Sequence, residues 1–260
     1  MKERLDKILV SKRLVKSREL AKALIMEGRV FVDGKKLTKS GTLVNDSSDI
    51  LIHETEQRYV SRGGLKLEAA LNFFNIDINK KVVMDVGSST GGFTDCLLKR
   101  GAKKVYCIDV GYGQLDWTLR KDARVVILER TNIRYLDKML SEKRKKFQAE
   151  EFEDIVKGNI DLATIDVSFI SLTKVIPSVL KFLKEKSEIL ALVKPQFEVG
   201  KDEVGKGGIV REDDKRLSSV KGVQEASRKL GLRIADVFQS PIPGHKGNIE
   251  YFLYMKTGSG

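Results

Sequence analysis

The feature that most constrains this 260-residue sequence is a β-branched run followed by a glycine-rich turn and an amphipathic segment, between Val82 and Asp95. This order predicts a strand, a loop and a helix. Three glycines in the loop, Gly87, Gly91 and Gly92, let the backbone approach a ligand closely because they carry no Cβ atom. The first amides of the following helix then form an anion site.

A second predicted strand, Val105 to Ile108, ends at Asp109, which follows Gly91 by 18 residues. In a βαβ nucleotide-binding unit, an acid at this place holds ribose hydroxyls. The glycine loop and the acid together therefore predict a site for a nucleoside-containing ligand.

Four interpretations of the loop compete. A dinucleotide site prefers G-x-G-x-x-G, but Ser89 occupies the second position, which disfavours pyrophosphate. The pattern G-x-S-x-G also fits the nucleophile elbow of hydrolases, which here needs His245 as the activating base. S-adenosylmethionine suits the loop better, with Asp85 near its ammonium or sulfonium side and the amides near Gly92 and Phe93 at its carboxylate. The fourth interpretation is a glycine turn without a ligand.

Composition limits the classes of protein. The hydrophobic fraction is 41%, which is ordinary for a globular protein, and the longest apolar run found, Ile189 to Val193, is too short to span a bilayer. The charged N-terminal segment lacks a signal-peptide core. Cys96 and Cys107 have no metal-ligand spacing and are expected to be buried free thiols in a reducing compartment. We therefore expect a cytoplasmic protein without a membrane segment or a metal; the sequence does not fix its oligomeric state.

The charge balance favours a polyanionic partner. Lys and Arg number 48 against 36 Asp and Glu, a net charge of +12, and residues 1–40 hold 12 basic against 5 acidic residues. The alternative is a solvated basic face without a specific partner. The basic residues predicted to follow an RNA backbone are Arg4, Lys12, Arg13, Lys16, Arg18, Lys22 and Arg29.

Residues 1–58 have the pattern of a small α+β unit. Ser17 is a plausible N-cap for a helix from Arg18 to Glu27, which Gly28 ends, and Asp33-Gly34 is a strong hairpin signal. The segment RLDKILVSKRLVKSRELAKALIMEGRVFVDGKKL resembles the S4 RNA-binding domain. This resemblance implies binding to structured RNA.

The remainder alternates predicted strands with helices, which indicates a mostly parallel sheet covered on both faces. We expect a linker at 59–64 and a second domain at 65–256. The strands are expected near 82–86, 105–108, 125–128, 162–165, 188–193, 233–239 and 250–256. The helices are expected at 65–74, 93–98, 113–121, within 141–158, and at 172–184 and 213–230.

Four polar side chains occupy the carboxyl ends of strands of this sheet: Asp85, Asp109, Asp166 and Lys194. In such folds ligands bind beyond the carboxyl ends of the strands. A lysine directly after five apolar residues suits a general base in a cleft, because its ammonium is then partly desolvated. Alternatively, Lys194 reaches the surface or pairs with Asp166 only to hold neighbouring strands.

The whole chain resembles the TlyA (hemolysin A) family of FtsJ/RrmJ-like ribosomal RNA 2′-O-methyltransferases. The resemblance rests on Ser61 to Leu67 and on DVGSSTGGFTD, TIDVSFISL, ALVKPQFE, VGKGGIVR and GHKGNIEYF, which occur in the family's order. It implies a Rossmann-like class I S-adenosylmethionine-dependent methyltransferase sheet behind a small S4 domain. It also implies a catalytic tetrad in which Lys194 takes the proton of a ribose 2′-hydroxyl and three residues orient it, namely Lys66, Asp166 and Glu250.

By the same resemblance and the loop argument, the cofactor is S-adenosylmethionine, and Asn132 lies near its adenine, although an asparagine there is equally a turn former. The residues expected to bind it are Asp85, Gly87, Ser89, Gly91, Gly92, Phe93, Asp109 and Asn132. The implied substrate is cytidine in ribosomal RNA, 16S, 23S or both, as free RNA or in subunits. Two alternatives are a haemolytic, membrane-active protein and a non-catalytic RNA-binding ribosome assembly factor.

Overall fold

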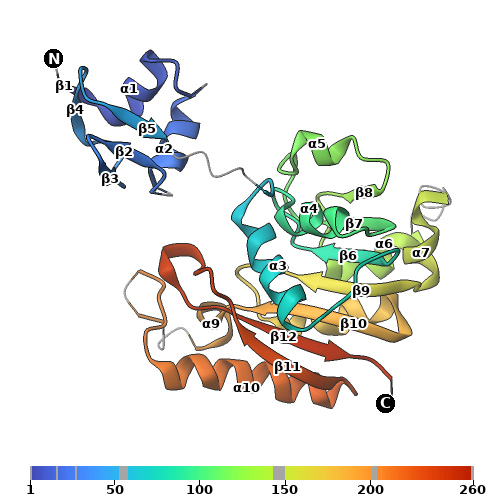
Figure 1. The fold of residues 1–260 in the computed structure, drawn as a ribbon. Helices are drawn as coiled ribbons and strands as arrows, with labels where there is room; N and C mark the ends of the chain where they lie inside the picture. Colours follow the sequence, from blue (N-terminus) through green and yellow to red (C-terminus); the bar gives the residue numbers. More distant parts are fainter. Residues whose placement is uncertain are drawn as a thin grey trace. The chain divides into compact units, whose positions relative to one another are not determined.

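The structure is a computed structural model that describes residues 2–15, 17–26, 28–52, 58–142, 150–200, 204–205 and 207–258. The chain separates into two compact units, Met1–Arg58 and Tyr59–Gly260. Each unit is described by itself, and Figure 1 shows the elements of both.

The first unit packs two helices against short antiparallel strands (Figure 1). Strands β1 and β4 pair with each other, and β3, β2 and β5 form a three-stranded sheet. The apolar sides of both helices meet in one core around Leu5, Ile8 and Ile25. The elements are β1 (Lys2–Arg4), α1 (Leu5–Ser11), α2 (Arg18–Met26), β2 (Val30–Val32), β3 (Lys35–Leu37), β4 (Leu43–Asn45) and β5 (Ile50–Ile52).

The local signals of this unit are confirmed. The Ser17 hydroxyl accepts a hydrogen bond from the Leu20 amide at 3.2 Å, as an N-cap does. Gly28 ends α2 with a φ of 69°. Asp33 and Gly34 both have positive φ and join β2 to β3 as a two-residue turn, the combination that a type I′ hairpin requires.

A buried carboxylate ties the start of α1 to the start of α2. Asp6 is fully buried, and it accepts hydrogen bonds from Arg4 Nε and Arg18 Nη2, each at 2.9 Å. The hydrogen bond from Arg4, with the one from Arg18, holds the pKa of Asp6 well below its usual range. Because a buried charge needs partners, these arginines stabilise the unit as well as adding to its positive charge.

The second unit contains a seven-stranded sheet within its described residues, in the order β11-β12-β10-β9-β6-β7-β8. Five neighbouring strands, β10 to β8, run parallel, and β12 and β11 extend the sheet in antiparallel pairing. All seven expected strands are present. They are β6 (Val82–Val86), β7 (Lys104–Ile108), β8 (Val125–Leu128), β9 (Ile160–Ile165), β10 (Leu183–Val193), β11 (Arg233–Gln239) and β12 (Tyr251–Lys256).

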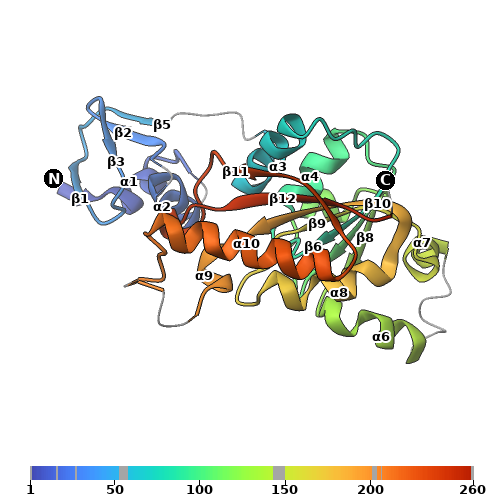
Figure 2. The same ribbon diagram turned by 90° about the horizontal axis from the view of Figure 1, so that it is seen from below.

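Helices cover both faces of this sheet (Figure 2). One core contains Leu67 of α3 and Leu97 of α4; the other, across the sheet, contains Val223 of α10. This is the predicted α/β architecture. The helices are α3 (Arg62–Phe73), α4 (Gly92–Lys99), α5 (Trp117–Arg120), α6 (Leu136–Glu142), α7 (Glu153–Lys157), α8 (Ile176–Val179), α9 (Pro195–Glu198) and α10 (Asp213–Lys229).

Two expected helices are wrong in extent, and a third, expected at 65–74, begins earlier, at Arg62. The helix expected at 172–184 is divided into α8 and two 3-10 turns, and β10 begins at Leu183 because that residue pairs with Ile160. The helix expected at 113–121 covers only Trp117–Arg120, since Asp116 caps it by accepting from the Thr118 amide. The charged segment 141–158 forms the end of α6, a 3-10 turn and α7, with 143–149 outside the described residues.

The described residues contain no helix that is long and apolar enough to cross a membrane. Nor do they bring three histidine, cysteine, aspartate or glutamate side chains together as metal ligands. Both cysteines are free and buried, as expected.

We predict that Asp6→Asn lowers the stability of the first unit by about 2 kcal/mol at pH 7, because the charged hydrogen bonds of a buried carboxylate are lost. Hydrogen exchange of the α1 and α2 amides measures this directly. Asp46→Asn is the control, since the Asp46 side chain is 71% exposed and lies 3.9 Å from Lys12; it should cost under about 0.5 kcal/mol.

The effect of Asp6→Asn should also depend on pH in a defined direction. The folded pKa of Asp6 is lowered, so its contribution is complete above its unfolded pKa and is lost as the pH falls toward the folded value. The difference in stability between variant and wild type should be the same at pH 7 and pH 5, and it should shrink only below about pH 4. A difference that already shrinks between pH 7 and pH 5 would contradict this pairing.

Candidate active site

The glycine loop between β6 and α4 has the backbone geometry that its sequence predicts. Gly87 and Gly91 have φ of 84° and 95°, and Gly91 is the N-cap of α4. A Cβ atom on Gly87 would lie 2.5 Å from the Asp166 carbonyl oxygen. Glycine is therefore required at position 87 for two reasons: its backbone conformation, and the close approach of Asp166, which follows the neighbouring strand β9.

A cavity of about 540 Å³, cavity A, lies beyond the ends of β6, β7 and β8. Asp109 and Asn132 line it. Asp109 accepts hydrogen bonds from the amides of Ser89 and Gly111 at 2.8 and 2.7 Å, so its carboxylate is fixed in position. Asn132 uses its side-chain oxygen to accept from the Arg134 amide at 3.1 Å. Asn132 is therefore both the turn former and a wall residue of cavity A.

A smaller cavity of about 260 Å³, cavity B, lies between the glycine loop and the start of α3. Gly92 and Phe93, at the N-terminus of α4, form one side, and Arg62 and Lys66 of α3 form another. Two helix N-termini and two cationic side chains thus border one small space. This electrostatic environment favours a carboxylate or another small anion. Cavity B shares Gly87, Ser89 and Asp166 with cavity A.

A third cavity of about 580 Å³, cavity C, is lined by three of the four predicted catalytic residues: Lys66, Lys194 and Glu250. Lys66 Nζ donates to Glu250 Oε2 at 2.7 Å, and Lys194 Nζ lies 2.6 Å from Asp166 Oδ1. The second contact is an ion pair rather than a well-aligned hydrogen bond. Both lysine side chains are 12% exposed, and Glu250 is 2% exposed.

Two of the four predicted catalytic side chains, Lys66 and Asp166, each border two cavities, and their partners Glu250 and Lys194 border cavity C. Lys66 borders cavities B and C, and Asp166 borders A and B. Two lysines with two carboxylates form two close pairs with little exposure to water. Such an arrangement can hold a polar group and exchange a proton with it.

Asp85 and Gly91, in contrast, are not among the residues that line the three cavities. Asp85 is fully buried beneath the loop, where it accepts hydrogen bonds from the hydroxyls of Thr94 and Thr164 at 2.7 and 3.0 Å. Burial raises the pKa of Asp85 to about 7 in spite of these hydrogen bonds. The structure thus places Asp85 as a support for the loop and not in the cavity wall.

Sequence reasoning missed several residues of the site. Ser168 and Phe169 border both cavity A and cavity C, and Phe169 is 91% exposed with a φ of 64°. Ser61 and Arg62 belong to cavity B. All four lie inside or beside motifs that carry the family resemblance, but no local pattern shows that they reach the site.

The basic residues expected to contact RNA differ in their surroundings within the first unit. Arg4 and Arg18 hold Asp6, and Lys12 lies beside Asp46. Arg13 and Lys22 are exposed, whereas Arg29 is half-buried. Lys16 lies outside the described residues.

We predict that Gly87→Ala destabilises the second unit more than Gly113→Ala does. Gly113 has a φ of 71° with no atom within 4 Å of an added Cβ, so its replacement costs only the backbone strain of about 1 kcal/mol. Gly87→Ala adds the collision with Asp166 and should cost at least about 1 kcal/mol more. Urea unfolding, followed by circular dichroism, compares the stability of the two variants. Equal losses of unfolding free energy would refute the close approach of Gly87 to Asp166.

Comparison with known proteins shows the family of the chain. The model of the FtsJ-like methyltransferase family matches residues 59–257, and the model of the S4 domain matches residues 3–51. A relative named 16S/23S rRNA (cytidine-2′-O)-methyltransferase TlyA, from Mycobacterium tuberculosis, is 43% identical over 98% of this chain and 90% of its own length.

Two further matches extend over almost the whole length. Hemolysin A of Brachyspira hyodysenteriae is 41% identical over 97% of this chain and 99% of its own. The solved structure of a candidate hemolysin from Streptococcus thermophilus is 39% identical, with a TM-score of 0.74 over 100% of this chain and 90% of that one. These matches confirm the resemblance seen in the sequence. The chain belongs to the TlyA (hemolysin A) family, in which an S4 domain precedes an FtsJ-like methyltransferase domain.

Proposed function

We propose that this protein is an S-adenosylmethionine-dependent ribosomal RNA (cytidine-2′-O)-methyltransferase, active on 16S rRNA, 23S rRNA or both. The observation that carries the proposal is that the Lys66–Glu250 and Lys194–Asp166 pairs line three cavities that share wall residues. The name of the Mycobacterium tuberculosis relative supplies the choice of cytidine and of both ribosomal RNAs.

The residues of cavities A and B fit S-adenosylmethionine. A volume of about 540 Å³ lies within the usual range for a small-molecule site, and the fixed Asp109 carboxylate suits ribose hydroxyls. Asn132 suits the adenine, and the helix N-termini with Gly92 and Phe93 suit the carboxylate. When bound, S-adenosylmethionine supplies an activated methyl group. Gly87 and Ser89 border both cavities, while Asp85 and Gly91 act through the shape of the loop.

Lys194 is the proposed general base. It takes the proton of the ribose 2′-hydroxyl at Nζ, while Asp166, 2.6 Å away, orients it and balances the charge that it gains. Lys66 and Glu250, which form a hydrogen-bonded pair in the lining of the same cavity C, are the residues proposed to hold the ribose and its hydroxyl. Since the methyl donor is already activated, the main contribution of these residues is positioning.

The S4 unit, residues 1–58, is the proposed RNA-docking part, and the second unit is the methyl-transfer domain. Residues 59–64, expected as a linker, belong to this second unit, because α3 begins at Arg62. Basic side chains contact phosphates without reading sequence, so this unit adds affinity and orientation. The partner is then ribosomal RNA or a ribosomal subunit, and the reaction takes place in the cytoplasm. Arg13 and Lys22, both exposed, are the side chains best placed to test this role.

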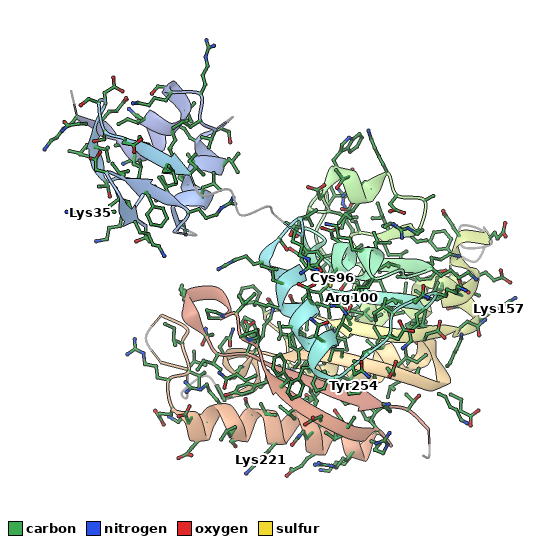
Figure 3. All side chains as sticks on the ribbon, in the orientation of Figure 1. Lys35, Cys96, Arg100, Lys157, Lys221 and Tyr254 are labelled. Carbon is green, nitrogen blue, oxygen red and sulfur yellow. The ribbon has the colours of Figure 1, made fainter. Side chains whose placement is uncertain are left out.

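We predict that Lys194→Ala lowers methyl transfer to ribosomal subunits at least about 100-fold, because the proton acceptor is lost. Binding of S-adenosylmethionine, measured by calorimetry, should stay within about threefold. Lys221→Ala is the matched control, since Lys221 projects outward from α10 (Figure 3). Alkali-resistant linkages at the labelled positions report ribose methylation. Normal methylation by Lys194→Ala would refute the assigned base, and absence of transfer by the wild type would favour the assembly factor.

We also predict that the double change Arg13→Ala and Lys22→Ala weakens binding to ribosomal RNA at every site tested. The slope of log K against log salt should fall by about one for each contact removed. Lys157→Ala is the control, because Lys157 pairs with Glu153 on α7 (Figure 3) and lines none of the three cavities. An unchanged salt slope in the double variant would exclude these two side chains from the RNA surface.

A further inference from the structure

Ser168 is not a member of the proposed tetrad, but its hydroxyl contacts the side chain of Lys194. Lys194 Nζ donates to Ser168 Oγ at 3.1 Å while it lies 2.6 Å from Asp166 Oδ1. Both acceptors follow β9 within three residues, and Lys194 follows β10. Because β9 and β10 are parallel neighbours with Ala191 opposite Ile165, the sheet itself holds these three side chains together.

Ser168 also occupies the boundary across which methyl transfer would take place. It lines cavity A, proposed for the methyl donor, and cavity C, proposed for the ribose. Asp166 lines cavity A and Lys194 lines cavity C. A side chain at this boundary can influence the direction of Lys194 without holding either ligand.

We propose that Ser168 is a positioning residue that, together with Asp166, aims the lone pair of Lys194 at the ribose 2′-hydroxyl. The proposal rests on the function proposed above. To act as a base, Lys194 first releases one ammonium proton to solvent, and the neutral amine then has two N–H bonds and one lone pair. Ser168 accepts one N–H, and Asp166 lies 2.6 Å from Nζ as the charge partner, so the lone pair of Nζ is left for a substrate in cavity C, which Lys194 lines.

The proton transfer is then balanced at Nζ. The O–H bond of the 2′-hydroxyl breaks, a third N–H bond forms on Lys194, and the electron pair stays on the ribose oxygen as the attacking nucleophile. The hydrogen bond to Ser168 stays in place throughout, and Asp166 balances the positive charge that Nζ gains. Without the Ser168 hydroxyl, one N–H loses its acceptor and the amine turns about the Cε–Nζ bond. Misdirection of a catalytic group on this scale costs about 10- to 100-fold in rate.

Three substitutions at one position separate this role from a general structural one. Ser168→Ala removes the acceptor, and Ser168→Cys keeps nearly the same shape with a weak acceptor. Ser168→Thr keeps the hydroxyl. Ser178→Ala, on α8 and away from the three cavities, is the control for loss of a serine hydroxyl.

The test is steady-state methylation of ribosomal subunits, with S-adenosylmethionine binding measured by calorimetry for each variant. We expect kcat to fall about 10- to 100-fold in Ser168→Ala and Ser168→Cys, with KM for RNA and cofactor affinity within about threefold. Ser168→Thr should keep at least about a third of the wild-type kcat, and Ser178→Ala all of it. If Ser168→Ala does not fold, Ser168→Cys carries the comparison.

Two results would overturn the proposal. One is a kcat within twofold of the wild type in both Ser168→Ala and Ser168→Cys. The other is a kcat in Ser168→Thr as low as in Ser168→Ala, which would mean that shape and not the hydroxyl matters. Inactivity of the wild type on all ribosomal RNA would instead refute the proposed function, so the two failures are distinguishable.

Discussion

The ion pair between Lys194 and Asp166 joins the carboxyl ends of two adjacent parallel strands, and the arrangement of the site depends on it. Each residue directly follows a run of buried strand positions, so neither side chain can move far from the end of the sheet. A partly desolvated charge is costly unless it is paired. The pairing therefore connects the wall of cavities A and B, which Asp166 lines, to the wall of cavity C, which Lys194 lines.

The glycine loop is the second requirement, and it is connected to the first. Gly87 brings the end of β6 so close to the Asp166 carbonyl that a methyl group does not fit between them. Beneath the loop, Asp85 is held by two threonine hydroxyls on α4 and β9, which links the loop to the strand that carries Asp166. Thus the loop that shapes cavities A and B also positions one partner of the ion pair.

Much of this could be predicted from sequence, because the signals are local. Seven strands, the Ser17 cap and the Asp33-Gly34 turn follow from periodicity and from the conformational preferences of single residues. The division of the 172–184 segment could not be predicted, since it depends on pairing with β9. For the same reason, the burial of Asp85 and the contact of Ser168 with Lys194 are visible only once distant strands are neighbours.

We propose that this cleft methylates a ribose oxygen of ribosomal RNA. Mass spectrometry of the nucleosides released from 16S and 23S rRNA, after purified protein and S-adenosylmethionine have acted on ribosomal subunits, tests this directly. We expect 2′-O-methylcytidine in an amount that rises with time, and none when the protein is omitted. Methylation on a base, or no methylated nucleoside at all from subunits or free RNA, would contradict the proposal.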